Sequence, residues 1–449
     1  MKKDLTQGNV TKTMLLFAGP MIVGNLLQQC YNIADTLIVG RVLGAGALAA
    51  VGSAYTLMTF LTSIIIGLCM GSGAVFSVCF GRGDRQQMKQ SMAASFLFVA
   101  LVTILINGIV FAGLHPILQL LRVPEEIYGL MQEYVRVIFF GIFFVFLYNY
   151  FAFLLRAVGN SVTPLCFLGV AAVLNIGLDM LFVMVLDFGV GGAALATVIA
   201  QAVSGLGIGV YVWLREPELR LNRRAFHFGK GRMLEIIRHA TAACIQQSVM
   251  NFGILMIQCL VNSFGATVMA AFAAAVKIDS FAYMPAQEFG NAFSLFISQN
   301  YGGGKRERVQ EGIRKAIQVS VVFCLVISIL IFFFAPFLMQ IFVKDTETAI
   351  IQTGVGYLRV EGSFYCGIGM LFLLYGYFRG VEKPEMSLIL TVISLGTRVL
   401  LAYLLAPLPA IGVWGIWWAI PIGWILADVT GLLCVKKEQR KNGRKGKAE

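Results

Sequence analysis

Two aspartates stand inside long apolar runs of the sequence, where a charged side chain is costly. Asp35 belongs to NIADTLIVG (32–40), and Asp179 belongs to LNIGLDMLF (174–182). A charge at the centre of a bilayer costs roughly 2.5 to 3.5 kcal/mol on insertion scales, so an acid in such a run usually faces a cavity or a partner. Desolvation disfavours the ionised form of a carboxylate. Both aspartates are therefore candidates for taking up and releasing a proton or another cation.

Asp35 ends a series of polar residues in the first apolar run. Their spacing of i, i+3, i+7 and i+10 places all of them on one face of a helix; they are Asn25, Gln28, Asn32 and Asp35. We expect this polar face to line a cavity and to include substrate-binding candidates, chiefly Gln28 and Asn32. The alternative is that Asp35 lies at the water-exposed end of its span and only caps the helix.

Asp179 has polar neighbours of its own. Asn175 precedes it by four residues and so shares its helix face. Thr197 lies in the next apolar run, GGAALATVIA (191–200), whose glycines and alanines allow close helix packing. We expect an ion site or proton site built from these oxygens, the alternative being that Asp179 is a static, hydrogen-bonded packing residue.

The second half of the chain carries a different set of charges. Lys277, Asp279 and Glu288 fall within AVKIDSFAYMPAQEFGNAF (275–293), and they are further candidates for a cavity or a substrate site. The spacing of nine between Asp279 and Glu288 places them on roughly opposite sides of a helix, so they need not form one site. Arg398 is a candidate of the same kind, which either pairs with Asp428 or extends to the membrane surface.

The sequence gives no support for metal or nucleotide chemistry. Its three histidines and nine cysteines are scattered singly, without the spacing of a zinc site or a disulfide framework. The segment YGGGKRER (301–308) lacks the G-x-x-x-x-G-K-[ST] spacing of a phosphate loop. We therefore expect no cofactor and no metal beyond a possible Na⁺ at Asp35, Asn175, Asp179 and Thr197. The energy source is expected to be a gradient of H⁺ or Na⁺.

The elements that must position these residues are membrane helices. Of the 449 residues, 58% are hydrophobic and only 13% are charged, and apolar runs of about 20 residues, enough to cross a ~30 Å hydrocarbon layer, recur throughout. We expect an all-α polytopic membrane protein with twelve transmembrane helices. The expected spans are 14–39, 50–79, 91–114, 131–155, 162–186, 190–213, 240–263, 268–299, 314–336, 355–377, 386–406 and 411–434.

Basic residues predict the orientation of these helices. With twelve spans both termini lie on one side, and the loops on that side hold 28 lysines and arginines against 3 on the other side, Arg41, Arg122 and Lys344. Since positively charged loops stay in the cytoplasm, both termini are expected there, in the cell (plasma) membrane. The net charge of +12 is then a topology signal, and the basic tail 436–449 needs no nucleic acid to explain it.

The chain repeats itself with an offset of 221 to 223 residues. CFGRGDR (79–85) aligns with NYGGGKR (300–306), and YVRV (134–137) aligns with YLRV (357–360). Six spans in each copy give both copies the same orientation, so we expect two six-helix lobes related by a pseudo-two-fold axis along the membrane normal. The expected domains are an N-terminal lobe (1–214), a basic cytoplasmic linker (215–238), a C-terminal lobe (239–435) and the tail (436–449).

Several of these segments resemble one family of secondary transporters. GNLLQQCYNIADTLIVGRVLGAGALAAVG (24–52), LLRAVGNSVTPL (154–165), NIGLDMLFV (175–183) and GVGGAALATV (189–198) are similar to the multidrug and toxic compound extrusion (MATE) family, over nearly the whole chain. The resemblance implies a two-lobe antiporter that exports organic cations and other amphipathic compounds in exchange for H⁺ or Na⁺. The expected partners are small amphipathic or cationic molecules and the lipid bilayer, and the intact twelve-span repeat allows a functional monomer.

The resemblance assigns roles to individual residues. Asp35 corresponds to the family's first-helix acid, and Asn175, Asp179 and Thr197 correspond to the cation site of its DinF-like branch. Pro20 corresponds to the proline at which that branch bends its first helix. The stretches that match the carboxylate-bearing spans of the NorM-like branch, QQSVMNFGILMI and SFYCGIGMLFLL, contain no acid, which favours the DinF-like branch and coupling through the first lobe.

Three other functions stay open. A flippase for lipid-linked saccharides would share the two-lobe plan but would need a cationic cavity. A membrane-embedded enzyme would need clustered catalytic residues, which the sequence does not contain, so we expect no enzyme. A non-transporting scaffold would not need a buried Asp179.

Overall fold

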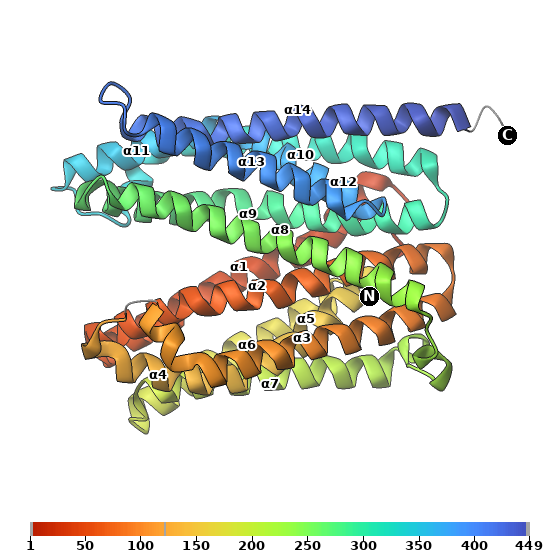
Figure 1. Cartoon of the computed structure of the whole chain (residues 1–449), viewed down its shortest axis with the longest axis horizontal. Helices are drawn as coiled ribbons and strands as arrows, with labels where there is room; N and C mark the ends of the chain where they lie inside the picture. The colour runs from red at the N-terminus through yellow and green to blue at the C-terminus, as the bar shows by residue number, and fades with distance from the viewer. Residues whose placement is uncertain (1–2, 121–122, 446–449) are drawn as a thin grey trace. The chain divides into compact units, whose positions relative to one another are not determined.

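The computed structural model describes residues 3–120 and 123–445, and over these residues the chain forms helices, turns and loops with no strand. The major helices are α1 (Val10–Val42), α2 (Gly44–Arg82), α3 (Arg85–Leu120), α4 (Glu125–Phe140), α5 (Ile142–Ala157), α6 (Val162–Asp179), α7 (Gly189–Arg215), α8 (Lys230–Asn262), α9 (Ala266–Gly302), α10 (Arg306–Gln340), α11 (Thr348–Ser363), α12 (Tyr365–Gly380), α13 (Pro384–Leu405) and α14 (Val413–Lys445). Figure 1 labels them. Three short segments complete the list: the π-helix η1 (Met180–Val185) and the 3-10 helices η2 (Pro217–Leu219) and η3 (Arg223–Phe226).

Most of these helices are long and apolar enough to cross a membrane. Within the described residues ten helices meet this test, and an eleventh span results if α4 and α5, which meet at a bend of 45°, count as one. The expected span at 355–377 corresponds to α11 and α12, which are separated at Phe364 and are not among the ten or eleven. The all-helical membrane class is thus confirmed, with ten or eleven spans by this measure where the sequence predicted twelve.

The break between α4 and α5 occurs at a glycine that lies against another helix. A Cβ atom at Gly141 would lie 2.8 Å from Cγ2 of Val198 on α7, which is too close for an ordinary contact. Glycine therefore permits α7 to approach the bend. Such an approach agrees with the packing of α7 against both α4 and α5.

The helix boundaries repeat along the chain. α4 and α11 each have 16 residues and begin at 125 and 348, a separation of 223, and α5 and α12 also have 16 residues each and begin at 142 and 365, again 223 apart. α6 and α13 begin at 162 and 384, 222 apart. These offsets agree with the 221 to 223 found in the sequence.

The chain divides into two compact units. The first unit comprises residues 1–6, 16–244 and 302–304, and the second comprises 7–15, 245–301 and 305–449. The expected cytoplasmic linker, 215–238, holds η2 and η3, but its last part already belongs to α8, which begins at Lys230. The first turns of α8 therefore belong to the first unit.

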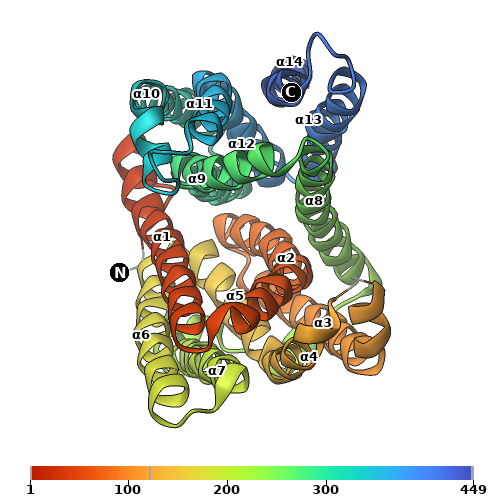
Figure 2. The ribbon, with the colours of Figure 1, turned by 90° about the vertical axis from the view of Figure 1, so that its left-hand side faces the viewer.

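Corresponding helices pack in the same way within each unit. In the first unit α7 packs against α4, α5 and α6, and α3 packs against α4 and α5. In the second unit α14 packs against α11, α12 and α13, and α10 packs against α11 and α12. Figure 2 shows α6 beside α7, and α13 beside α14. The duplication thus extends from sequence to tertiary packing.

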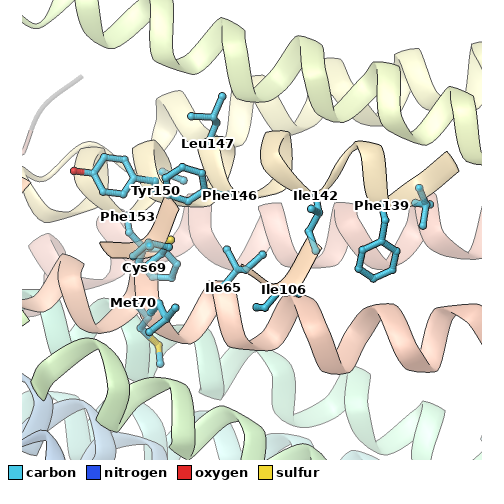
Figure 3. Packing of buried hydrophobic residues seen from close by; sticks show 14 of the residues in the cluster. Ile65, Cys69, Met70, Ile106, Phe139, Ile142, Phe146, Leu147, Tyr150 and Phe153 are labelled. Carbon is cyan, nitrogen blue, oxygen red and sulfur yellow. The ribbon is translucent and has the colours of Figure 1, made fainter. Parts of the chain in front are cut away.

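The core of the first unit lies between α2, α3, α4 and α5. Figure 3 shows Ile65 and Cys69 of α2 near aromatic residues of the following helices. The ring of Tyr150 meets those of Phe76 and Phe96 edge-on, with centroids 6.1 and 5.2 Å apart, and the Tyr150 hydroxyl donates to the carbonyl of Met92 at 2.7 Å. Because this buried hydroxyl has a partner, the aromatic core holds no unpaired polar atom at Tyr150.

Large apolar side chains also cover much of the outer surface. Val173, Phe333 and Leu101 are each more than 60% exposed although they belong to apolar helices. Such a surface is expected where the surrounding solvent is hydrocarbon. Of the basic residues counted for orientation, Lys2, Arg122 and Lys447 lie outside the described residues.

Candidate functional site

A polar cavity of about 310 Å³ lies within the first unit. α1 contributes the side chains predicted from its polar face, Gln28, Asn32 and Asp35. The rest of the lining is neutral, and it includes Tyr31, Tyr55, Met58, Tyr134, Tyr148, Asn175, Thr197, Gln201 and Ser204. Asp35 is the one charged residue among the described residues of this lining. We refer to the space as the first-unit cavity.

Asp35 lies well inside its helix. α1 continues to Val42, seven residues beyond Asp35, and the side chain is only partly exposed, with its Oδ1 atom buried. Asp35 therefore faces the cavity, and the interpretation that it merely caps a helix end does not fit this position. Pro20, the expected bend, lies inside the same continuous helix.

Asp179 is completely buried and is not part of the cavity wall. It is the last residue of α6, and the backbone beyond it continues as the π-helix η1. The Asp179 carboxyl group lies next to the carboxyl group of Asp35 and interacts with it electrostatically. Single-turn π segments inside helices are frequent at functional sites, because the extra residue redirects the side chains around it. The structure thus brings together two acids that are 144 positions apart in the sequence.

Asn175 and Thr197 complete this group, which we call the Asp35–Asp179 site. The Asn175 amide Nδ2 donates to Thr197 Oγ1 at 3.3 Å, and Thr197 Oγ1 donates to the carbonyl of Ala193 at 3.1 Å. Within the part of the chain that the structure describes, no group donates a hydrogen bond to Oδ1 of Asp35, Oδ1 of Asn175 or either carboxylate oxygen of Asp179. Four buried acceptor oxygens of this group therefore lack a hydrogen-bond donor in the described part of the chain.

This arrangement suits a bound proton or a small hard cation. Two neighbouring carboxylates repel each other when both are ionised, so a shared proton or a cation between them lowers the energy of the pair. Carboxylate, amide and hydroxyl oxygens are also the ligands that hard cations prefer. The donor-free oxygens fit either ion, since each would supply the missing positive partner.

A second group of charges lies within the second unit. A smaller cavity, about 90 Å³, is lined by Asp279, Glu361 and Arg398 together with Tyr283 and Tyr357. Tyr365 donates its hydroxyl to Asp279 Oδ1 at 2.7 Å, and Arg398 interacts electrostatically with both acids. We call this group the second-unit cluster.

Glu361 is a member of the second-unit cluster that sequence reasoning missed. It is 3% exposed, its Oε2 atom has no hydrogen-bond donor among the described residues, and it lies within the expected span 355–377. Glu361 precedes by two residues the stretch SFYCGIGMLFLL, which begins at Ser363 and contains no acid. A lone acid within a predicted membrane span was the signal that could have found it.

The remaining second-half candidates lie elsewhere. Glu288 interacts electrostatically with Arg379, whose Nη2 donates to Asn291 Oδ1 at 3.0 Å, so Glu288 and Asp279 belong to separate groups, as their helical spacing predicted. Lys277 is exposed and lines none of the described cavities. The suggested Arg398–Asp428 pair was wrong, because Arg398 is directed to the second-unit cluster instead.

The described residues contain no cluster that resembles a zinc site or another transition-metal site. No group of three or more histidine, cysteine or acidic side chains within them has the geometry to hold a metal ion, and all nine cysteines are free thiols. Cys79, for example, is buried beside Ser91 with its sulfur 4.0 Å from the serine oxygen. The site chemistry thus rests on the acids and their oxygen-bearing neighbours.

Comparison with known protein families gives a match in each half of the chain. The family model described as MatE matches residues 20–181 and again 242–404. The two matches start 222 residues apart, which agrees with the sequence repeat. Together they cover more than two thirds of the chain.

Relatives and solved structures agree with this match. The chain is 33% identical over 400 residues to the "Probable multidrug resistance protein YpnP" of Bacillus subtilis (strain 168), covering 87% of each chain. It is 27% identical over 420 residues to the "Probable multidrug resistance protein NorM" of Thermotoga maritima, covering 91% of this chain and 88% of that one. The structure entitled "Crystal structure of MATE in the bent conformation" superposes with a TM-score of 0.92 at 24% identity, covering 99% of this chain and 98% of that chain.

Proposed function

This chain belongs to the MATE family of multi-pass membrane transporters, and from that premise we propose that it exports amphipathic organic cations in exchange for H⁺ or Na⁺. Its relatives carry the names of multidrug resistance transporters, not of enzymes. We place it in the cell membrane, as a monomer with both termini cytoplasmic and with twelve helices in two lobes related by pseudo-two-fold symmetry. Its coupling residues favour the DinF-like branch.

The observation that carries this proposal is the contact between Asp35 and Asp179. Asp35 borders the first-unit cavity, whereas Asp179 is buried behind it with both oxygens lacking a donor. Asp35 and Asn175 belong to the cavity wall, so we propose that an ion reaches Asp179 past these two residues. The charge of Asp35 affects both the binding of cargo in the cavity and the binding of an ion at Asp179. The two binding events therefore influence each other.

Exchange follows from this shared charge. With the acids unprotonated and ion-free, the cavity is negative and attracts a cationic cargo. Uptake of H⁺ or Na⁺ neutralises the two acids, removes the attraction for the cargo and so favours cargo release. Loss of the ion on the other side of the membrane restores the negative charge and with it the attraction. A ligand shifts a conformational equilibrium only by its different affinities for the two states. A bend of α1 near Pro20, on the helix that carries Asp35, is the shape change that we propose to couple ion binding to alternating access.

The lining of the first-unit cavity supports a flat cationic cargo. Tyr31, Tyr55 and Tyr134 present aromatic rings, and Met58 presents a polarizable thioether, near the Asp35 carboxylate. Aromatic faces attract organic cations, and methionine adapts its shape to different partners. A cavity of about 310 Å³ lies at the small end of the range for drug-sized ligands.

The rival functions are less well supported. A flippase for a lipid-linked saccharide would need cationic side chains for the pyrophosphate, yet no lysine or arginine is present among the described residues that line the first-unit cavity. A membrane-embedded enzyme would need a nucleophile or acid–base pair at a substrate site. A scaffold would have no use for two adjoining, donor-free acids.

The test is efflux from proteoliposomes that contain the purified full-length protein. Export of a cationic dye such as ethidium is measured under an imposed pH gradient, with and without a Na⁺ gradient, for the wild type and for Asp179→Asn. We expect the variant to lose gradient-driven export, because asparagine neither binds a proton nor neutralises Na⁺. Full export by D179N would refute the proposal.

Asp187→Asn is the matched control. Asp187 lies only eight residues beyond Asp179 and is exposed, so the same chemical change there should leave export unaltered. Melting temperatures of both variants establish whether D179N is folded. Comparison of the two gradients also distinguishes H⁺ from Na⁺ as the coupling ion.

A further inference from the structure

The second unit carries an open groove that no step of the proposed export uses. It has a volume of about 590 Å³ and lies between α10, α11 and α14. Most of its lining is apolar, with Phe332, Val355, Phe364, Trp414 and Trp418 among the contributing residues. Its one charged residue among the described lining is Arg359, so we call it the Arg359 groove.

The guanidinium of Arg359 is held in place but not neutralised. It lies over the Phe332 ring, 5.3 Å from the ring centroid, and its Nε atom donates to the Phe332 carbonyl at 3.3 Å. Among the described residues it forms no ion pair, and its two Nη groups make no hydrogen bond. The half of the guanidinium that can bind an anion with two parallel hydrogen bonds therefore stays available.

The nearby acid does not supply the missing partner. Glu361 is only two residues from Arg359, but it belongs to the second-unit cluster, where it interacts with Arg398 and Tyr357. The two charges thus face different cavities. An anion from outside the protein is the partner that the Arg359 groove lacks.

The position of the groove identifies the kind of anion. Phe332 and Pro336 belong to the last turns of α10, Trp414 and Trp418 belong to the first turns of α14, and Arg359 belongs to α11, which begins at Thr348. α10 ends and α14 begins close to these residues, and Ile351 and Gln352 lie near the start of α11, so this end of the groove lies toward one surface of the membrane. Arg359 lies about two turns further along α11. Trp414 and Trp418 are 50% and 45% exposed, and tryptophan is enriched where membrane helices meet the lipid headgroups.

We propose that the Arg359 groove binds an anionic phospholipid, whose phosphate meets the Arg359 guanidinium and whose acyl chains lie along the apolar lining. Trp414 lies over Gly356, where a Cβ would be 3.1 Å from Cη2, so the indole forms part of the floor on which a chain rests. Gln352 and Ser363 add polar groups to the same lining. The groove differs from the first-unit cavity in the sign of its charge, so it discriminates against cationic cargo.

The internal repeat supplies a matched control. Arg136 occupies the position in α4 that corresponds to Arg359 in α11, since YVRV aligns with YLRV at an offset of 223. Arg136 is also exposed, but it lines none of the described cavities. Substitution of Arg136 therefore removes a positive charge from the equivalent helix of the first unit and leaves the Arg359 groove unchanged.

Native mass spectrometry of the detergent-purified full-length protein tests the proposal. Phosphatidylglycerol and phosphatidylcholine with identical acyl chains are titrated against the wild type, Arg359→Gln and Arg136→Gln, and the fraction of protein with one bound lipid is measured. We expect the wild type to prefer phosphatidylglycerol, and R359Q to lose roughly tenfold in affinity for it, as expected for a charge-assisted pair of hydrogen bonds. R136Q should keep the preference.

Two further variants complete the design. Arg359→Lys keeps the charge but not the planar fork, so it should retain part of the preference; Arg359→Met replaces R359Q if that variant does not fold. Trp414→Ala should weaken the binding of phosphatidylglycerol and of phosphatidylcholine equally, because it removes apolar contact and no charge. An unchanged lipid preference in R359Q, or an equal loss in R136Q, would overturn the proposal. Neither result bears on ion-coupled export.

Discussion

The Asn175 amide donates a hydrogen bond to Thr197 Oγ1, 3.3 Å away on the neighbouring helix. This bond fixes the orientation of the amide, with its nitrogen toward α7 and its Oδ1 atom buried without a donor. Because Asn175 precedes Asp179 by one helical turn, the free amide oxygen and the Asp179 carboxylate occupy the same helix face. Thr197 thus acts on the site through Asn175, and it does so without a charge of its own.

The first prediction concerns this positioning role. Thr197→Val removes the acceptor while keeping the side-chain shape, so the Asn175 amide becomes free to rotate. We expect the apparent affinity for the coupling ion to fall by roughly three- to tenfold, the effect of one hydrogen bond, with the maximal export rate little changed. The measurement is the dependence of dye efflux on ion concentration in proteoliposomes.

Thr430→Val is the control for the first prediction. Thr430 also donates its hydroxyl to a carbonyl of its own helix, that of Leu426 at 2.8 Å, but it is partly exposed on α14 and lines none of the described cavities. Its replacement should not change the ion dependence. An unaltered ion dependence in T197V would show that the Asn175–Thr197 bond has no role in ion binding.

The second prediction concerns the repulsion between Asp35 and Asp179. In alkaline solution without Na⁺ both acids tend to ionise, so Asp35→Asn or Asp179→Asn should each raise the melting temperature by removing the same repulsion. Tyr31 and Tyr134 interact with the pair, and tyrosine is neutral through most of this range. The double variant should then be little more stable than either single variant. The stabilisation by the two substitutions together is expected to fall short of the sum of the single effects by about 1 to 3 kcal/mol.

Thermal unfolding in detergent at two pH values measures this second effect. At acidic pH the acids are neutral, and the differences between the variants should nearly vanish. If Na⁺ is the coupling ion, it should stabilise the wild type more than any variant, because a ligand stabilises only the state that binds it. Strictly additive effects of the two substitutions would mean that the carboxyl groups do not interact.

The membrane class, the repeat and the polar faces could be predicted because each depends on local sequence patterns. Asn175 and Asp179 share a face through helical periodicity alone, and the 223-residue offset is visible in the letters before it is visible in α4 and α11. The break inside the expected span 355–377 was less accessible, because α11 and α12 are separated at Phe364 and hydropathy carries no signal for that break.

Contacts between helices far apart in sequence could not be derived in the same way. The sequence placed Asp35 and Asp179 each on a polar face, but only packing of α1 near α6 makes them neighbours. For Arg398 the sequence left two alternatives, a pair with Asp428 or extension to the membrane surface, whereas the fold directs it to Glu361 and Asp279. The π-helix after Asp179 is likewise a product of packing, since MLFVMV has no residue that requires it.

The third prediction concerns Arg398 in the second-unit cluster. Arg398 offsets the charge of two buried acids, Asp279 and Glu361, which are 4% and 3% exposed. Arg398→Gln leaves both without a counter-charge, so we expect a loss of about 1 to 3 kcal/mol in stability, the usual cost of an unsatisfied buried polar group. Thermal unfolding of the purified variant measures the loss.

Glu361→Gln provides the comparison for the third prediction. In the double variant R398Q/E361Q one acid is removed together with its partner, so part of the lost stability should return. A double variant that is less stable than R398Q would show that Glu361 stabilises the fold independently of Arg398.

The fourth prediction concerns the contact between α2 and the first turns of α8, both in the first unit. A Cβ at Gly71 would lie 2.2 Å from the carbonyl oxygen of His239, a backbone atom that cannot rotate away. Gly71→Ala should therefore separate the two helices and cost about 2 to 3 kcal/mol, as overpacking does elsewhere. Gly52→Ala, on the same helix, has nothing within 4 Å of its new Cβ and should be neutral or stabilising, since alanine is the better helix former. Melting temperatures of the two variants decide the matter: equal values would mean that close approach at Gly71 does not hold α8 against α2.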